Sequence, residues 1–180
     1  DIIPRVLNKL KREKQYWEPV GQSTAGGHQT VGNVFDLDHE VLRELRIILN
    51  EAISSYRTRF SKEENMMIQD WPNNTYLEGW FVSLKTGGHM NPHIHPEGWL
   101  SGVLYLDMPT PNGTEEGGIE FSYEAQQDTH KSKCIPRKSI VPKVGELILF
   151  PSSLYYRTIP FTQKANRSCL AFDVKPKINK

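Results

Sequence analysis

The sequence predicts an α+β fold that is mainly β: a jelly-roll, cupin-like barrel (a double-stranded β-helix) with N-terminal helices packed on its outside. Apolar residues recur at helical intervals only in the first 70 residues or so. From Trp71 onward, short β-branched and aromatic runs alternate with Gly, Pro and Asn. Strands of this length with no helix between them favour an antiparallel double-sheet barrel. We therefore expect a single domain over 1–180, with a helical support region (1–70) and a jelly-roll core (71–176).

The helical part contains two expected helices. A short amphipathic helix is predicted over Pro4–Trp17, where apolar residues alternate with Lys and Arg and Pro4 suits a first turn. The glycine-rich stretch 21–32 follows neither period and is interpreted as a loop. A longer helix is expected over Val41–Tyr56, capped by Asp36 or Asp38.

The β part contains five expected strands, each a β-branched or aromatic run bounded by turn residues. They are Tyr76–Leu84, Leu100–Leu106, Gly118–Tyr123, Glu146–Phe150 and Ser168–Val174. The polar segment 122–140 lies between two of them and is interpreted either as a substrate loop or as an insert without a role.

Composition excludes some classes of partner. The 22 Lys and Arg nearly balance the 21 Asp and Glu, and no long basic run is present, so we expect no nucleic acid partner. No apolar run approaches the roughly 20 residues of a membrane span, so we expect no membrane partner. Two cysteines are too few for a disulfide scaffold and favour a cytoplasmic location, although three sequons, at Asn73, Asn112 and Asn166, keep a secretory route open.

The segment Pro92-His93-Ile94-His95-Pro96 is the strongest indication of chemistry. Two imidazoles one residue apart point the same way only on extended backbone, and the flanking prolines favour that geometry. Neutral imidazole binds a divalent metal without losing a proton. Taken alone, such a pair is typical of two surface histidines, so its interpretation depends on the rest of the chain.

The order of the following motifs resembles that of the Fe(II)/2-oxoglutarate-dependent oxygenases, in particular their prolyl-hydroxylase-like branch with an H-x-H motif. The motifs run from Trp80 to Val174, about half of the chain: after the histidine pair come Ser101–Leu106, Gly117–Phe121, Gly145–Ser152 and Asn166–Asp173. The resemblance implies Fe(II) as the metal, 2-oxoglutarate as cosubstrate and hydroxylation as the reaction. The substrate, a small molecule, a peptide or a protein, is not identified by the sequence.

The resemblance also implies roles for particular residues. His93 and His95 match the first two metal ligands, and Arg167 matches the arginine that pairs with the far carboxylate of 2-oxoglutarate. A buried guanidinium can hold a carboxylate with two parallel hydrogen bonds. Tyr105 and Ser101 are further candidates for the cosubstrate pocket, and Cys169 should share the face of Arg167 because strand side chains repeat every two residues. An outward-facing arginine and a tyrosine that only fills the core remain the alternatives.

The chain departs from the family at the third metal ligand. Counted back from Pro160, the position of the distal histidine falls on Tyr156. A phenol has a pKa near ~10 and its anion suits ferric better than ferrous iron, so Tyr156 is a poor replacement. Glu97 or His89 could step in, although the glycines and prolines around them interrupt the strand.

Three hypotheses therefore remain. The chain is a hydroxylase whose activity the missing histidine impairs, a catalytically inactive oxygenase-like binding module in which Tyr156 plugs the metal position, or a cupin-type metalloprotein with other chemistry. Cupins place a glutamate three or four residues after the second histidine, where this chain has Trp99 or Leu100, so the cupin match is partial.

Overall fold

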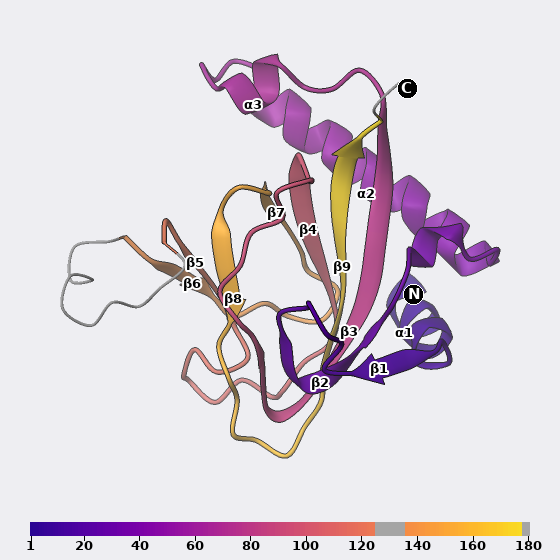
Figure 1. Cartoon of the computed structure of the whole chain (residues 1–180), viewed down its shortest axis with the longest axis vertical. Coiled ribbons are helices and arrows are strands. Elements are labelled where there is room, and N and C mark those ends of the chain that lie inside the picture. Colours follow the sequence, from indigo (N-terminus) through magenta and orange to yellow (C-terminus); the bar gives the residue numbers. More distant parts are fainter. Residues whose placement is uncertain (125–135, 178–180) are drawn as a thin grey trace.

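The structure, a computed structural model, describes residues 1–124 and 136–177, and its strands form two antiparallel sheets that face each other (Figure 1). The larger sheet has the order β1-β2-β3-β9-β4-β7, and the smaller has the order β6-β5-β8. Helix α2 runs along the outer face of the larger sheet (Figure 1). The jelly-roll barrel with outer helices is thus confirmed.

The helices are α1 (Ile2–Lys11), α2 (Glu40–Arg59), α3 (Met66–Gln69) and the 3-10 turn η1 (Val34–Asp36). The strands of the larger sheet are β1 (Gln15–Trp17), β2 (Thr24–Thr30), β3 (Thr75–Met90), β4 (Leu100–Asp107), β7 (Leu147–Pro151) and β9 (Arg167–Pro176). Those of the smaller sheet are β5 (Ile119–Ser122), β6 (Lys138–Ile140) and β8 (Tyr155–Thr158).

Two apolar cores lie on opposite faces of the larger sheet. On the outer face, Leu45 and Leu49 of α2 and Leu10 of α1 pack in one cluster with alternate residues of β4 and β9, such as Phe172. On the inner face, side chains of both sheets fill the barrel, among them Phe121. The inner core contains the candidate site, and the outer core packs the helices against the other face of the same sheet.

Strands β4 and β9 carry the interior residues in register. Tyr105 pairs with Cys169, and Ser101 pairs with Asp173. Since side chains alternate between faces, Arg167, Cys169 and Asp173 share the inner face of β9. The strand rises about 3.3 Å per residue, so the backbones at 167 and 173 are about 20 Å apart along the barrel.

The N-terminal part differs from the sequence prediction. Residues 24–30, expected in a loop, form strand β2, because glycines allow a close approach to β3: a Cβ on Gly26 would lie 2.8 Å from the Cα of Gly88. The strand consists mostly of polar and glycine residues, so it shows no alternation of apolar residues from which it could be predicted. The first helix ends at Lys11 rather than at Trp17, and the region 1–70 therefore contributes two strands as well as helices.

The long helix is confirmed, but its cap is not an aspartate. His39 is the N-cap residue of α2, and its Nδ1 accepts from the backbone N–H of Val41 at 3.3 Å. All five expected strands are present in the structure. The segment 122–140 ends in β6, while residues 125–135 lie outside the described part of the chain.

Candidate active site

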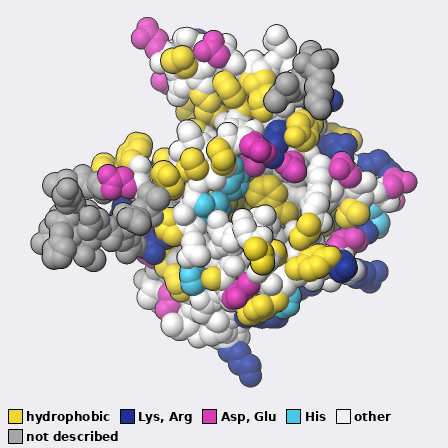
Figure 2. Space-filling view, viewed as in Figure 1, with side chains coloured by type: hydrophobic (Ala, Val, Ile, Leu, Met, Phe, Trp, Pro, Cys, Tyr) yellow, Lys and Arg dark blue, Asp and Glu magenta, His cyan; other side chains and the backbone are white. Residues whose placement is uncertain are grey.

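An open cavity of about 520 Å³ lies where β2, β3 and the segment after β3 meet. Figure 2 shows histidine side chains in a hollow on this face, with hydrophobic side chains beside them and acidic side chains at its edge. Trp80 forms part of the wall, and its ring lies 5.3 Å from that of His95. The polar and charged residues that line the rest are Gln22, Ser23, Gln29, Thr30, Glu78, His93, Glu97, Asp173 and Lys175.

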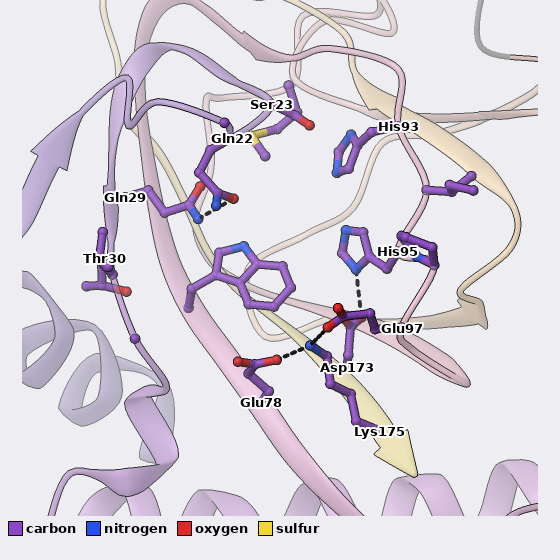
Figure 3. Close-up of a pocket in the computed structure, with 17 residues that line it drawn as sticks. Gln22, Ser23, Gln29, Thr30, Glu78, His93, His95, Glu97, Asp173 and Lys175 are labelled. Carbon is purple, nitrogen blue, oxygen red and sulfur yellow. Dashed lines mark hydrogen bonds and ion pairs between the residues drawn. The ribbon is translucent and has the colours of Figure 1, made fainter. Parts of the chain in front are cut away.

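The two histidines lie side by side, as the sequence predicts, with ring centroids 5.1 Å apart (Figure 3). His93 is fixed by an isolated bridge to Tyr156, in which each backbone N–H donates to the other carbonyl at 3.1 Å. Its Nδ1 lies 2.6 Å from the carbonyl oxygen of Asn91, which leaves Nε2 free. Burial lowers the pKa of His93 to about 4, so the ring is neutral at pH 7 and keeps the lone pair that a metal needs.

Asp173 orients the second histidine. Its carboxylate lies 2.6 Å from Nδ1 of His95 and also accepts a hydrogen bond from the hydroxyl of Ser101 at 2.7 Å (Figure 3). Ser101 in turn lies 2.8 Å from the hydroxyl of Ser152. A carboxylate on one ring nitrogen fixes the tautomer and leaves the other nitrogen as the acceptor or metal ligand.

Tyr156 lies next to this acceptor nitrogen. Its hydroxyl is 3.1 Å from Nε2 of His95, and its ring is 4.4 Å from the ring of His93. Burial, together with the nearby charge of Asp173, raises the pKa of Tyr156 well above the usual value for a phenol, so the hydroxyl keeps its proton and donates. A phenol therefore stands at the position expected for the third metal ligand.

Two of the side chains present, His93 and His95, fit the ligand positions of one metal ion. Both Nε2 atoms come from imidazoles whose other nitrogen has an oxygen partner, the arrangement typical of metal-ligating histidines. Among the described residues, no group of three His, Cys, Asp or Glu side chains converges on one point. The side chains that could hold a metal are thus the two imidazoles, with the phenol of Tyr156 beside them.

A second polar centre lies deeper in the barrel, around Arg167. The residue is buried, with 2% of its surface exposed. Its Nε donates to the carbonyl of Gly117 at 2.7 Å, its Nη1 lies 4.0 Å from the sulfur of Cys169, and the guanidinium stands 5.1 Å from the centre of the Tyr105 ring. Among the described residues, no carboxylate pairs with it. An uncompensated buried charge costs several kcal/mol, so this site favours an anion.

Tyr105 adds a second unsatisfied group at the same place. Its hydroxyl is buried and has no hydrogen-bond partner among the described residues. Burial raises the pKa of Tyr105 above its usual value, so the hydroxyl remains a donor; the Arg167 charge opposes this only partly. A guanidinium and a hydroxyl that both lack an acceptor fit the carboxylate of a cosubstrate such as 2-oxoglutarate.

The space at this second centre is closed. Arg167, Tyr105, Cys169 and Tyr156 line a cavity of only about 10 Å³. That volume corresponds to roughly one water molecule. A dicarboxylate that reached from Arg167 to the histidines would have to displace side chains, and Tyr156 lines the cavity on that path.

Other candidates from the sequence lie elsewhere. Ser101 was expected among the cosubstrate residues, but it contacts Asp173 and Ser152 near the histidines, because it lies four residues along β4 from Tyr105. Glu97 is exposed and pairs with Lys175 at 2.9 Å, which directs its carboxylate away from the metal position (Figure 3).

His89 also does not substitute for the missing ligand. It lies on β3 opposite Ala25 of β2, and its Nδ1 contacts the carbonyl of Gly87 at 3.2 Å. His130 lies outside the described residues.

Sequence reasoning missed Asp173. The signal was available, because β9 alternates and Asp173 is two residues beyond Ala171 on the inner face. The acceptor role of the Gly117 carbonyl has no comparable signal in the sequence.

The family follows from comparison with known proteins. Residues 78–173, more than half of the chain, match the family described as "Putative 2OG-Fe(II) oxygenase". The chain belongs to this family of 2-oxoglutarate- and Fe(II)-dependent oxygenases, which confirms the resemblance, the class of enzyme, and iron and 2-oxoglutarate as the cofactors of that class.

Individual relatives agree with this assignment. A PKHD-type hydroxylase of Prochlorococcus marinus (strain NATL1A) is 29% identical over 161 residues, which cover 83% of this chain and 62% of the relative. The chain thus spans less than two thirds of the length of that relative.

Solved structures share the fold. A prolyl-4-hydroxylase of Pseudomonas putida superposes with a TM-score of 0.65 at 15% identity, covering 99% of this chain and 88% of its own. HygX of Streptomyces hygroscopicus, solved with nickel and 2-oxoglutarate bound, gives a TM-score of 0.63 at 13% identity, covering 98% of this chain and 79% of its own.

One further observation concerns membranes. Of the helices in 1–124 and 136–177, none combines the length and the apolar character that a bilayer crossing requires.

Proposed function

We propose that this chain is an Fe(II)- and 2-oxoglutarate-dependent dioxygenase that hydroxylates a small molecule, a peptide or a protein side chain presented at the open cavity. Family membership supports the reaction class. The name of the Prochlorococcus relative, a PKHD-type hydroxylase, supports hydroxylation in particular. The open cavity of about 520 Å³ is within the range of small-molecule sites and is also accessible to an extended peptide.

The observation that carries the proposal is the buried guanidinium of Arg167, which has no carboxylate partner among the described residues. A folded protein that leaves such a charge uncompensated loses stability unless a ligand supplies the missing carboxylate. Tyr105 presents a hydroxyl in the same cavity that has no hydrogen-bond partner in 1–124 or 136–177. Both groups face the barrel interior that also holds His93 and His95. A cosubstrate that contacts both Arg167 and a metal on the histidines would have to lie in this interior.

The residues take the following roles in this proposal. His93 and His95 hold the metal through Nε2, and Tyr156 stands at the position where the family has its third protein ligand. Arg167 binds and orients the far carboxylate of 2-oxoglutarate, assisted by the Tyr105 hydroxyl, and Cys169 shapes the wall beside them. When bound, iron and 2-oxoglutarate supply the activation of O₂ that oxidises a C–H bond of the substrate.

The protein contributes position and solvent exclusion. Asp173 keeps the ring of His95 in one orientation, and the bridge between His93 and Tyr156 ties the histidine segment to the smaller sheet. The apolar side chains of the inner core exclude water from the side of Arg167, where a carboxylate interacts most strongly. The open cavity leaves the other side of the histidines accessible to substrate and O₂.

Anaerobic titration of the chain with Fe(II), followed by 2-oxoglutarate, tests the proposal. We expect one Fe(II) per chain, and 2-oxoglutarate binding that is lost in Arg167→Ala. The matched control is Arg5→Ala, which removes an exposed arginine of α1. If neither Fe(II) nor 2-oxoglutarate binds, the proposed activity is excluded.

A second candidate function is a non-catalytic binding module. The observation that favours it is the bond between Tyr156 and His95, which satisfies the imidazole without a metal. The same titration separates the two functions, because a binding module takes up 2-oxoglutarate or another carboxylate without any stoichiometric iron. A cupin-type metalloprotein would bind metal with no dependence on Arg167.

A further inference from the structure

We propose that the side chain of Met90 separates the open cavity from the closed cavity at Arg167, and that 2-oxoglutarate binds only when this side chain moves aside. Met90 thereby sets the affinity of the chain for its cosubstrate. The inference rests on the proposed function, because it concerns how the same cosubstrate reaches Arg167. Substitutions at position 90 leave Arg167 and both histidines in place, so the two ideas can be tested apart.

Met90 borders both cavities. Its side chain lines the open cavity of about 520 Å³ together with His93 and His95. It also lines the closed cavity of about 10 Å³ together with Arg167 and Cys169. In the described part of the chain, Met90 is the one residue that the two linings share. A dicarboxylate that extends from Arg167 to a metal on the histidines would pass the position of this side chain.

The closed cavity has no room for the cosubstrate as it stands. Its volume of about 10 Å³ corresponds to roughly one water molecule. Met90 is buried in the inner core with 7% of its surface exposed, so it fills the space between the two cavities. Binding of 2-oxoglutarate at Arg167 therefore requires a side chain to move. The candidates nearest to the histidines are Tyr156 and Met90.

Tyr156 is held firmly. Its backbone N–H and carbonyl are each bonded to His93 at 3.1 Å. Its hydroxyl lies 3.1 Å from Nε2 of His95, and its ring lies 4.9 Å from that of Phe150. Movement of the phenol would give up the hydroxyl contact and the ring contacts together.

Met90 is held less firmly. The hydroxyl of Thr24 lies 3.2 Å from its sulfur, but the same hydroxyl lies 2.8 Å from Oε1 of Gln29. A hydroxyl has one proton to donate, and a thioether is a weaker acceptor than an amide oxygen. A methionine side chain also turns about three bonds and adapts to irregular space. Met90 is therefore the side chain that moves at lower cost, and the open cavity beside it provides the room.

The size of the effect follows from the population of the open arrangement. A ligand that binds only a minor arrangement shows an affinity reduced by the fraction of that arrangement. Minor arrangements commonly amount to about 10% or less. Met90→Ala removes the side chain beyond Cβ, so it should tighten 2-oxoglutarate binding by roughly tenfold or more and raise the association rate by a similar factor.

A second substitution should have the opposite effect. Met90→Ile is close to methionine in volume, but its β-branched side chain is stiff. It should therefore weaken 2-oxoglutarate binding and slow association. Because isoleucine keeps the core filled, this variant tests the inference even where the alanine variant does not fold.

Calorimetric titration of the full chain with 2-oxoglutarate at saturating Mn(II) gives the affinities, and stopped-flow tryptophan fluorescence gives the association rates. The matched control is Met108→Ala. This methionine also packs against the inner core but lines neither cavity, so its removal should leave both quantities unchanged. Thermal melts show which variants are folded.

The outcomes are distinct. Tighter binding in Met90→Ala with weaker binding in Met90→Ile supports the inference. A folded Met90→Ala that binds no tighter than the native chain, or a Met90→Ile that binds equally well, overturns the role of Met90 and leaves the proposed function standing. If neither the native chain nor any variant binds 2-oxoglutarate, the proposed function itself fails.

Discussion

The two polar centres of the barrel interior differ in how completely the protein satisfies them. At the histidine end, Asp173, Ser101 and Tyr156 supply hydrogen-bond partners, and the site opens to a cavity of about 520 Å³. At the other end, Arg167 has no carboxylate partner among the described residues, Tyr105 has an unpaired hydroxyl, and about 10 Å³ of space is enclosed.

The two ends therefore differ in how much stability a bound ligand would add. Unsatisfied buried groups destabilise the free protein, so the arginine end gains most from a ligand. The histidine end gains less stability from its ligand, because a metal on His95 must replace the hydrogen bond from the Tyr156 hydroxyl. In the proposed function, the arginine end therefore gains more stability from its ligand than the histidine end does, and substitutions at each end test this separately.

The largest expected effect concerns the metal ligands. His95→Ala or His93→Ala should lower metal affinity by more than about 100-fold, since even residues one shell further out contribute roughly 10- to 100-fold. His89→Ala is the matched control, because this histidine lies on β3 away from the site and should leave affinity unchanged. Equilibrium dialysis with Mn(II) gives the three affinities. Equal losses in all three variants would show that the histidine pair is not the metal site.

The second effect concerns the arginine end, where two changes of opposite sign are expected. Arg167→Met should reduce 2-oxoglutarate affinity by roughly 100-fold, because a charge-assisted, bidentate contact is lost. The same variant should stabilise the ligand-free protein by about 1 to 4 kcal/mol, because it removes an unpaired buried charge. Calorimetric titration and urea unfolding measure the two quantities. A free protein that is destabilised by Arg167→Met would mean that the guanidinium already has its counter-charge.

A smaller effect is expected from the residue that orients His95. Asp173→Asn keeps an acceptor but removes its charge, and metal affinity should fall by about tenfold. Glu97→Gln is the matched control: it removes a carboxylate from the rim of the same cavity, where the partner is Lys175 rather than an imidazole. Metal binding that responds equally to both substitutions would indicate a general effect of charge and not the hydrogen bond to His95.

The smallest effect concerns the unpaired hydroxyl. Tyr105→Phe should weaken 2-oxoglutarate binding by roughly threefold to tenfold, the value of one hydrogen bond to a ligand. Stability of the free protein should be unchanged or slightly higher, because a buried hydroxyl without a partner is removed. Affinity from calorimetry and the thermal midpoint check both parts. Unaltered affinity would place the cosubstrate away from Tyr105.

The sequence predicted the parts of the fold that follow a clear period. The long helix was found because its apolar residues recur at helical spacing, and the five strands were found because they are β-branched and aromatic runs bounded by turn residues. Strand β2 was missed because its glycines and polar residues pack by close backbone approach rather than by apolar burial. Strand β8, which carries Tyr156, was also missed, as were the three-residue strands β1 and β6.

The site was predictable to a similar extent. His93 and His95 line the open cavity, and Arg167, Tyr105 and Cys169 line the small inner one. Their roles toward a metal and a cosubstrate stay predictions. The bond between Tyr156 and His95 was not predictable, since it depends on the distance between strand β8 and the segment after β3, which are far apart in the sequence. Asp173 could have been found by continuing the alternation of β9 by one more step.

The central claim is that a metal on the histidine pair and a dicarboxylate on Arg167 share one interior. Anaerobic addition of 2-oxoglutarate to the Fe(II)-loaded chain tests it most directly, because chelation of the iron by the cosubstrate produces a weak visible charge-transfer band. We expect this band in the unchanged chain, and its absence at the same 2-oxoglutarate concentration in Arg167→Met. Stoichiometric Fe(II) with no band at saturating 2-oxoglutarate would contradict the claim.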